Sequence, residues 1–296
     1  MKEKVCMVTG ASSGIGMELA LGLARMGATV VMVCRDQSRG EAARDEIIEK
    51  SGNPKVELLL ADLSSQAEIR RLAENSKARY SQLHVLINNA GVAPIKRSVT
   101  ADGIETVFAV NYLAPFLLTH LLLDVLKSSA PARVVNVAGD FHRKATIRFD
   151  DLMSEKDYDG IRANNQAKLA LILFTYELAR RLVGTGVTAN CLHPGAVATD
   201  APLKDPDLAP FARFMYSLVK PFFLSPEKGA ETPIYLATSP GMEAVTGKYF
   251  IKNAAVTSSP ESYNEEIARR LWSASEELAG LVEKEADTTA FTSVES

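Results

Sequence analysis

Three glycines stand in a run of small residues, Thr9-Gly-Ala-Ser-Ser-Gly-Ile-Gly16, directly after an apolar stretch. Small residues let the backbone turn sharply, and a helix that begins at Gly14 would direct free N–H groups at a pyrophosphate. Three glycines alone are a weak signal, but a place between an expected strand and an expected helix makes it strong. The run predicts a dinucleotide-binding turn formed by Gly10, Ser12, Ser13, Gly14, Ile15 and Gly16.

Cys34-Arg35-Asp36 follows the second expected strand, where the adenosine ribose of a bound dinucleotide would lie. An arginine there suits a ribose 2′-phosphate through a charge-assisted contact, whereas an acidic residue suits a 2′-hydroxyl. Because Arg35 comes first, we expect NADP(H) in preference to NAD(H). The alternative is that Arg35 is solvated and Asp36 faces the ribose.

These residues need a scaffold of alternating strands and helices. Apolar, strand-like runs occur at 5–9, 29–34, 56–60, 83–88, 133–137 and 187–193, and amphipathic segments lie between them at 14–26, 38–51, 66–80, 100–126 and 161–183. Near-continuous apolar strands in β-α alternation indicate a parallel sheet covered on both faces. With right-handed crossovers, the pattern predicts an α/β fold with one Rossmann-type doubly wound sheet, in a domain over residues 1–281.

Two segments depart from this alternation of strands and helices. Residues 201–226 hold five prolines and a run of aromatic residues, and we expect them to form a lid over a hydrophobic or aromatic small-molecule substrate. The alternative is a packing surface or a partner interface. Residues 282–296 are polar and are expected to be disordered.

The composition excludes several classes of function. A net charge of -3 over 296 residues gives no electrostatic footprint for nucleic acid. No run approaches the roughly 18 apolar residues of a membrane span, and no signal region follows Met1, so we expect a cytoplasmic protein. Cys6, Cys34 and Cys191 lie far apart without metal-ligand spacing, which indicates buried reduced thiols and no metal site.

The spacing Gly10-x-x-x-Gly14-x-Gly16, with Asn88-Asn-Ala-Gly91 after the fourth strand, resembles the short-chain dehydrogenase/reductase family. Further phrases fit its retinol-dehydrogenase-like branch: Ala61-Asp-Leu-Ser64, Arg133-Val-Val-Asn-Val137, Lys168-Leu-Ala170, Leu178-Ala-Arg-Arg-Leu182 and Leu192-His-Pro-Gly195. The resemblance covers about residues 4 to 250. It implies an NAD(P)-dependent oxidoreductase.

The resemblance also implies roles for single residues. Asp62 and Leu63 would meet the adenine, Asn88, Ala90 and Gly91 would line the central cofactor path, and Pro194, Gly195, Val197 and Thr199 would wrap the nicotinamide and its phosphates. Asn111 would hold a catalytic helix distortion, and Lys168 would bind the nicotinamide ribose. The alternatives are a plain polar helix residue at Asn111 and a surface lysine at Lys168. Members of the family often pair through two long helices, here 100–126 and 161–183, which implies a possible homodimer.

The chain departs from the family at two catalytic positions. The family's acid/base tyrosine stands four residues before the lysine, where this chain has Asn164, and its serine after the fifth strand corresponds to Gly139. An amide cannot shuttle a proton near neutral pH, and Tyr158 is ten residues from Lys168, about 15 Å along a helix. A positioned general acid contributes about 10²–10⁴-fold, and an oxyanion donor about 10²–10³-fold.

Asp140 and His142 follow the fifth strand at the edge where such sheets bind ligands, so either is a candidate substitute acid or base. Asn164 itself is a candidate for binding a substrate as donor and acceptor. The alternatives are structural roles for all three. We expect an atypical NADP(H)-dependent oxidoreductase with a substitute acid or a substrate that needs none, such as an iminium or a conjugated acceptor. A non-redox catalyst (cyclase or isomerase) and a non-catalytic NADP(H)-binding protein remain alternatives.

Overall fold

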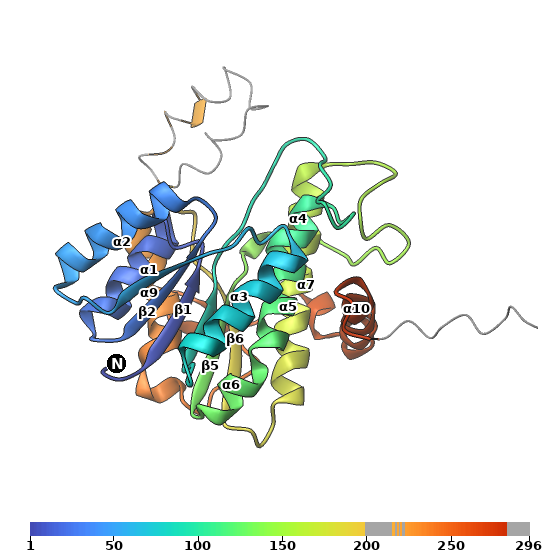
Figure 1. Ribbon diagram of the computed structural model, residues 1–296. Coiled ribbons are helices and arrows are strands. Elements are labelled where there is room, and N and C mark those ends of the chain that lie inside the picture. The colour runs from blue at the N-terminus through green and yellow to red at the C-terminus, as the bar shows by residue number, and fades with distance from the viewer. Residues whose placement is uncertain (199–214, 217, 219, 221–222, 283–296) are drawn as a thin grey trace, which may run out of the picture.

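A computed structural model describes residues 1–198, 215–216, 218, 220 and 223–282 (Figure 1). All six expected strands form, and two more follow them. The strands are β1 (Val5–Thr9), β2 (Thr29–Cys34), β3 (Val56–Leu60), β4 (Val85–Asn88), β5 (Ala132–Val137), β6 (Val187–His193), β7 (Tyr249–Ile251) and β8 (Ala254–Val256). They make one sheet in the order β3-β2-β1-β4-β5-β6-β7-β8, parallel except for β8. The predicted Rossmann-type doubly wound fold is confirmed.

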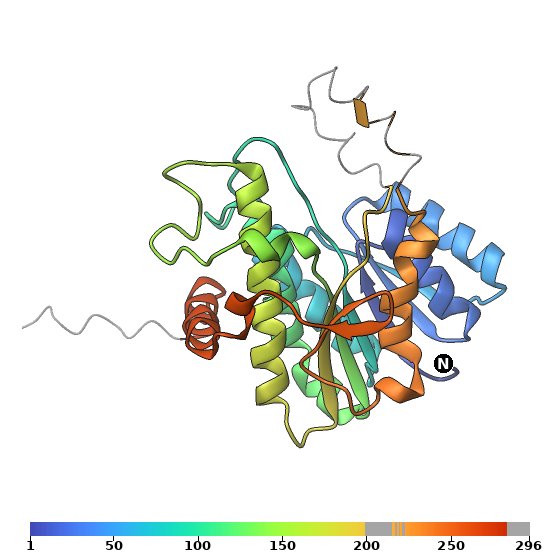
Figure 2. The same ribbon diagram turned by 180° about the vertical axis from the view of Figure 1, so that it is seen from behind.

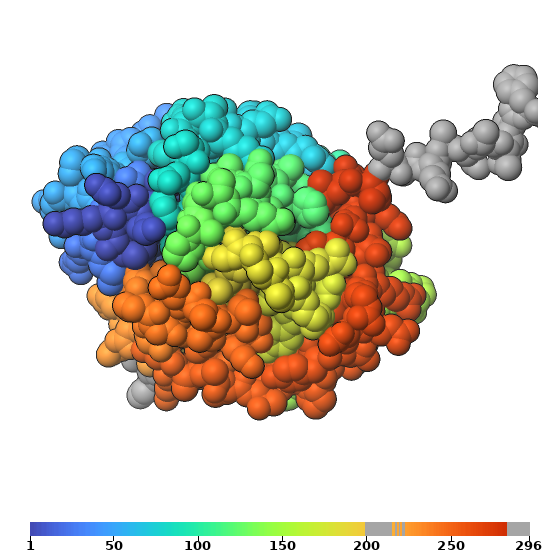
Figure 3. Space-filling model, turned by 90° about the horizontal axis from the view of Figure 1, so that it is seen from below, coloured from blue at the N-terminus to red at the C-terminus, as the bar shows by residue number. Residues whose placement is uncertain are grey.

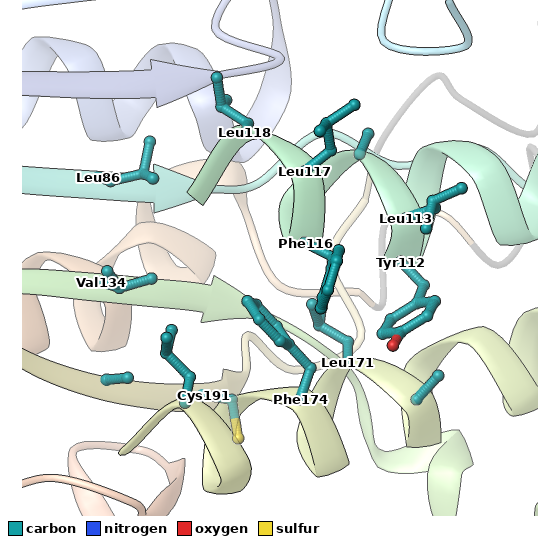
Figure 4. Close-up of a cluster of buried hydrophobic side chains, with 14 of the residues drawn as sticks. Leu86, Tyr112, Leu113, Phe116, Leu117, Leu118, Val134, Leu171, Phe174 and Cys191 are labelled. Carbon is teal, nitrogen blue, oxygen red and sulfur yellow. The ribbon is translucent and has the colours of Figure 1, made fainter. Parts of the chain in front are cut away.

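Helices cover both faces of this sheet (Figures 1 and 2). One face carries α1 (Gly14–Arg25), α2 (Gln37–Ser51) and α9 (Pro226–Thr238), and the other carries α3 (Gln66–Arg79), α5 (Ala114–Leu121), α6 (Leu123–Ser128) and α7 (Gly160–Arg181). Alternate strand residues feed two apolar cores: Met7 belongs to the core beneath α5 and α7, and Val8 to the core beneath α1. Figure 4 shows the first core, where Phe116 and Phe174 pack above the strands.

The strand order reverses at β1, which lies between β2 and β4. Connections from β1 therefore run to opposite sides of the sheet, and a crevice opens at the carboxyl ends of the strands at this switch point. The turns after β2 and β3 lie on one side of the crevice, and the turns after β5 and β6 lie on the other.

The predicted long helix over 100–126 begins later and is interrupted. The chain forms α4 (Thr106–Phe108), a π-helical turn over Ala109–Leu113, then α5 and α6. Glu105 caps α4 by accepting hydrogen bonds from the backbone N–H groups of Val107 and Phe108, so the helix cannot begin earlier. A single π turn is typical of a functional position, and this one contains Asn111.

The helix α10 (Glu265–Leu278) was not predicted, and it packs on α7 and α5. Trp272 contacts Phe116 and Phe174 with ring centroids 5.1 and 5.7 Å away, and the hydroxyls of Tyr112 and Ser275 share a 2.6 Å hydrogen bond. Figure 3 shows the red C-terminal segment against the yellow end of α7. The helices proposed for a homodimer are therefore covered on this side by α10 of the same chain.

Several predictions fall on residues outside the described part of the chain: most of the lid at 201–226, the tail beyond 282, and Thr199. All three cysteines are buried and reduced, as expected. Within the described ranges, no helix is long and apolar enough to cross a membrane. Those ranges also hold no group of three or more His, Cys, Asp or Glu residues arranged to bind a metal ion.

Candidate active site

A cleft of about 1070 Å³ opens along the carboxyl edge of the sheet at the switch point. Its walls come from the turns after the first six strands, from α4 and the π turn, from α7, and from residues just before the start of α9. Of the residues predicted to contact a dinucleotide, the following line it: Gly10, Ser12, Ser13, Gly14, Ile15, Gly16, Arg35, Asp62, Leu63, Ala90, Gly91, Lys168 and Pro194.

The turn after β1 is shaped for phosphate. Gly10 has φ +68°, and a Cβ on Gly16 would lie only 2.2 Å from the Gly10 carbonyl oxygen, so neither position accepts a larger residue. Ser13 precedes α1, and no described side chain caps that helix. The first N–H groups of α1 are thus free to bind an anion beside the cleft, which fits a dinucleotide pyrophosphate.

Two arginines line the ribose end of the cleft. Arg35 is joined there by Arg39, from the first turn of α2, which the sequence reading missed. Asp36 also reaches the cleft, but its Oδ1 accepts a 2.8 Å hydrogen bond from the Arg39 backbone N–H and caps α2. This cap engages one of the two carboxylate oxygens of Asp36. The spacing Asp36-x-x-Arg39 was the missed signal, because residues in the first turn of a helix lie beside its cap.

Asp62 and Leu63 lie at the adenine end, where one carboxylate oxygen of Asp62 accepts hydrogen bonds from Ser64. Ala90 and Gly91 line the middle of the cleft, but Asn88 does not. Its amide is buried and donates to Asn136 at 2.8 Å and Thr119 at 3.1 Å. The side chain of Asn88 is therefore not on the cleft wall, because strand alternation turns it into the core. Asn89 lines the cleft instead.

At the other end, Pro194 lines the cleft while Gly195 and Val197 pack behind it. A Cβ on Gly195 would lie 2.5 Å from Leu224, and Val197 forms a β-bridge with Leu224. Both residues shape the segment after β6 and do not line the cleft wall.

Asn111, Asn164 and Lys168 come together beside Gly91. The Asn111 Nδ2 donates to the Val92 carbonyl at 2.8 Å and to Asn164 Oδ1 at 3.0 Å, and its Oδ1 accepts from the Val92 backbone N–H at 2.8 Å. Lys168, one turn further along α7, donates to the Val137 carbonyl at 3.2 Å. The π turn, the loop after β4 and α7 are thereby joined through side chains.

Burial shifts the pKa of Lys168. Desolvation lowers the pKa of Lys168 from 10.5 to about 8, because the ammonium loses water. A cationic lysine with a pKa close to neutrality binds polar oxygens and exchanges protons within the physiological range.

Gly139 leaves room beside this lysine. A Cβ there would meet nothing closer than Lys168 Cγ at 3.9 Å, and its φ of 163° is extended backbone that any residue adopts. The site thus has space where the family resemblance implies a serine.

Asp140 and His142 are not brought to this space. His142 is fully buried: its Nδ1 contacts the Gly139 carbonyl at 2.7 Å, and its Nε2 accepts from the Ser259 N–H at 3.1 Å. Burial also lowers the pKa of this imidazole, so it is a neutral structural link. Asp140 pairs with Arg143 at 2.7 Å and accepts from the Tyr249 hydroxyl at 3.3 Å. Their predicted role as substitute acids is therefore not supported by the geometry.

Two further ring side chains lie outside the cleft lining. Tyr158 donates to the Pro94 carbonyl at 3.3 Å, and burial raises the pKa of its hydroxyl to about 12. His193, the last residue of β6, was missed by the sequence reading although it directly precedes Pro194. Its Nδ1 is buried with no partner among the described residues, and burial lowers its pKa.

The fold and the cleft define a dinucleotide-binding α/β protein. The sequence profile described as short chain dehydrogenase matches residues 4–206, and the chain belongs to that family of NAD(P)-dependent oxidoreductases. It is 45% identical to retinol dehydrogenase 12 of Mus musculus over 278 residues, covering 94% of this chain and 87% of that protein. It is 42% identical to human retinol dehydrogenase 14 over 296 residues, covering 95% and 88%.

Comparison with solved structures supports the same fold. An uncharacterised protein from Mycobacterium paratuberculosis superposes with a TM-score of 0.76 at 30% identity, covering 94% of each chain. The RhlG/NADP active-site complex of Pseudomonas aeruginosa superposes with a TM-score of 0.65 at 30% identity, covering 84% of this chain and 94% of that one.

Proposed function

We propose that the protein is an atypical NADP(H)-dependent oxidoreductase that acts on a hydrophobic, retinoid-type small molecule. The observation that carries the cofactor choice is the pair of arginines, Arg35 and Arg39, beside an Asp36 already engaged as a helix cap. Two guanidinium groups favour a 2′-phosphate through charge-assisted hydrogen bonds. RhlG, a relative of 30% identity, is described as an NADP complex, which supports the same choice.

The substrate class follows from the lining opposite the adenosine end. Val92, Val110, Val137, Ala138 and Phe223 present apolar surface there. An apolar wall with few polar groups selects a lipophilic molecule and orients it through those groups. The retinol dehydrogenases among the relatives carry a lipophilic substrate in their names, which supports a retinoid-type molecule.

The chain's own groups would bind and orient the cofactor. The N-terminus of α1 would hold the pyrophosphate, the arginines the 2′-phosphate, and Lys168 the nicotinamide ribose. A bound nicotinamide supplies or accepts a hydride. The chain has an amide at Asn164 and no side chain at Gly139, so the proton chemistry differs from the family's usual arrangement.

The test combines binding and turnover with the purified protein. NADPH fluorescence should change saturably on binding, and NADPH should be consumed when a lipophilic aldehyde such as retinal, or a conjugated ketone, is added. Saturable binding without consumption across such carbonyl compounds contradicts an oxidoreductase and favours a cofactor-binding protein. A flat NADPH titration contradicts the cofactor assignment itself. The variant Arg44→Ala, on α2 but outside the cleft lining, is the control for charge removal.

A further inference from the structure

The orientation of one amide fixes the orientation of another. Val92 offers Asn111 both a backbone N–H and a carbonyl, and the two bonds of 2.8 Å are satisfied only if Oδ1 faces the N–H and Nδ2 faces the carbonyl. The second hydrogen of Nδ2 then points to Asn164 at 3.0 Å. Because this hydrogen needs an acceptor, Asn164 must present its Oδ1 to Asn111.

With Oδ1 turned toward Asn111, the Nδ2 of Asn164 faces away from that partner. The side chain of Asn164 is partly exposed, and the described residues give its Nδ2 no hydrogen-bond partner. Lys168 lies four residues later on the same face of α7, and its Nζ is likewise a donor on the cleft wall. Helix geometry therefore places the Asn164 Nδ2 and the Lys168 Nζ on the same face of α7, and Gly139 leaves space beside Lys168.

Apart from Lys168 itself, the described side chains beside this space supply no acid group. The carboxylates on the described cleft wall, Asp36 and Asp62, belong to the adenosine side. Asp140 and His142 are engaged in structural bonds. A localised alkoxide needs a proton as it forms, whereas a delocalised oxyanion is a weaker base that fixed N–H donors stabilise without proton transfer.

We propose that Asn164 Nδ2 and Lys168 Nζ form a binding site for delocalised oxyanions, and that the substrate class is α,β-unsaturated carbonyl compounds reduced at the carbon–carbon double bond. This inference rests on the proposed function. The hydride of a reduced nicotinamide forms a C–H bond at the β-carbon, and the π electrons move to the carbonyl oxygen. The enolate held by the two donors then takes a proton from water at its α-carbon, so that two electrons and two hydrogens are accounted for.

A binding experiment tests the site without turnover. 4-Nitrophenol changes colour on ionisation, and the NADP⁺-loaded protein should bind its phenolate and lower its pKa. Asn164→Asp keeps the acceptor toward Asn111 but replaces the donor with a negative charge, so phenolate affinity should fall on the order of 10²-fold. Asn264→Asp, at the cap of α10 where aspartate also caps, adds the same charge far away and should change nothing. Equal affinity in Asn164→Asp and the unaltered protein overturns the oxyanion site.

A labelling experiment tests the substrate class. With NADPH carrying two deuterium atoms at C4, chalcone should give dihydrochalcone with one deuterium at the β-carbon, and dihydrochalcone should not be reduced. An allylic alcohol with deuterium at the carbinol carbon overturns this inference and leaves the proposed oxidoreductase intact. NADPH binding with no deuterium transferred to chalcone, dihydrochalcone or retinal overturns both.

Discussion

Asn111 of the π turn and Asn164 of α7 share a hydrogen bond of 3.0 Å beside the loop after β4. The same Asn111 amide holds Val92 in the loop after β4 through two backbone bonds. One side chain thus joins three segments that are far apart in the sequence. This explains why the helix departs from α geometry at Asn111: the extra residue of a π turn brings the amide toward the loop.

Removing the Asn111 side chain should destabilise the protein. Asn111→Ala leaves the Val92 N–H and carbonyl and the Asn164 oxygen without their partner, so the free energy of unfolding should fall by about 1–3 kcal/mol. Asn164→Ala removes one bond from a half-exposed residue and should have a clearly smaller effect. Urea unfolding followed by circular dichroism measures both. Equal losses in the two variants would show that the Val92 bonds contribute little.

Cofactor selectivity should depend on Arg35 and Arg39. Either change to alanine should weaken NADPH binding at least about tenfold while NADH changes little, because only NADPH carries the 2′-phosphate. Titrations of both nucleotides at two salt concentrations check this, and the NADPH difference should shrink at high salt. Comparable losses for NADH and NADPH would contradict the 2′-phosphate assignment.

The sheet could be predicted because its strands are apolar on both faces and end in turn residues, so each run has one reasonable interpretation. The elements after residue 226 could not be predicted. β7 and β8 are three residues each, too short for a pattern, and α10 shows its role only through Trp272, whose partners Phe116 and Phe174 lie about a hundred and more residues away.

The cofactor half of the cleft was predictable for a similar reason: a glycine turn between a strand and a helix has a defined geometry. The direction of each side chain was not predictable. Asn88 points into the core by strand alternation, and His142 is buried by Ser259, a residue 117 positions away. A sequence shows that a histidine follows a strand, but not that a distant backbone N–H occupies its nitrogen.

The buried Lys168 should make stability rise with pH. Its pKa is about 8 in the folded protein and about 10.5 when unfolded. Below pH 8 the charged amine is buried at its full cost; between pH 8 and 10.5 the unfolded state binds more protons, and that cost fades. Lys168→Met should therefore be more stable than the unaltered protein at pH 7, with the advantage shrinking toward pH 10. Urea titrations at several pH values measure it, and the exposed Lys156→Met should show a flat difference.

The helix α10 should keep the protein from pairing through α5 and α7. We expect a monomer by light scattering after size-exclusion chromatography. Trp272→Ala empties a site lined by Phe116, Phe174 and the Arg181 guanidinium, which lies 4.1 Å from the Trp272 ring centre. The loss should be about 3–5 kcal/mol, with dimers or aggregates appearing as the apolar face opens. A dimer in the unaltered protein that survives substitutions at exposed positions of α10 would contradict this view of the surface.

Restoring the family's hydroxyls should change which bond is reduced. Gly139 lies in extended backbone with its nearest obstacle 3.9 Å away, so Gly139→Ser should fold normally. Asn164→Tyr places a phenol one helical turn from Lys168, whose positive charge lowers a neighbouring phenol's pKa. The double variant should then protonate an alkoxide as it forms, and reduction of simple ketones should rise by about 10²–10⁴-fold.

The single variants separate the two contributions. Gly139→Ser alone adds a hydrogen-bond donor but no acid, and Asn164→Tyr alone adds the acid but removes the donor beside Lys168, so each should gain less than the pair. Unchanged NADPH affinity is the control that the cofactor end is intact. If the double variant binds NADPH normally and still reduces no saturated ketone, the missing hydroxyls are not what limits the site. The apolar walls at Val110 and Phe223 would then be the feature that sets substrate choice.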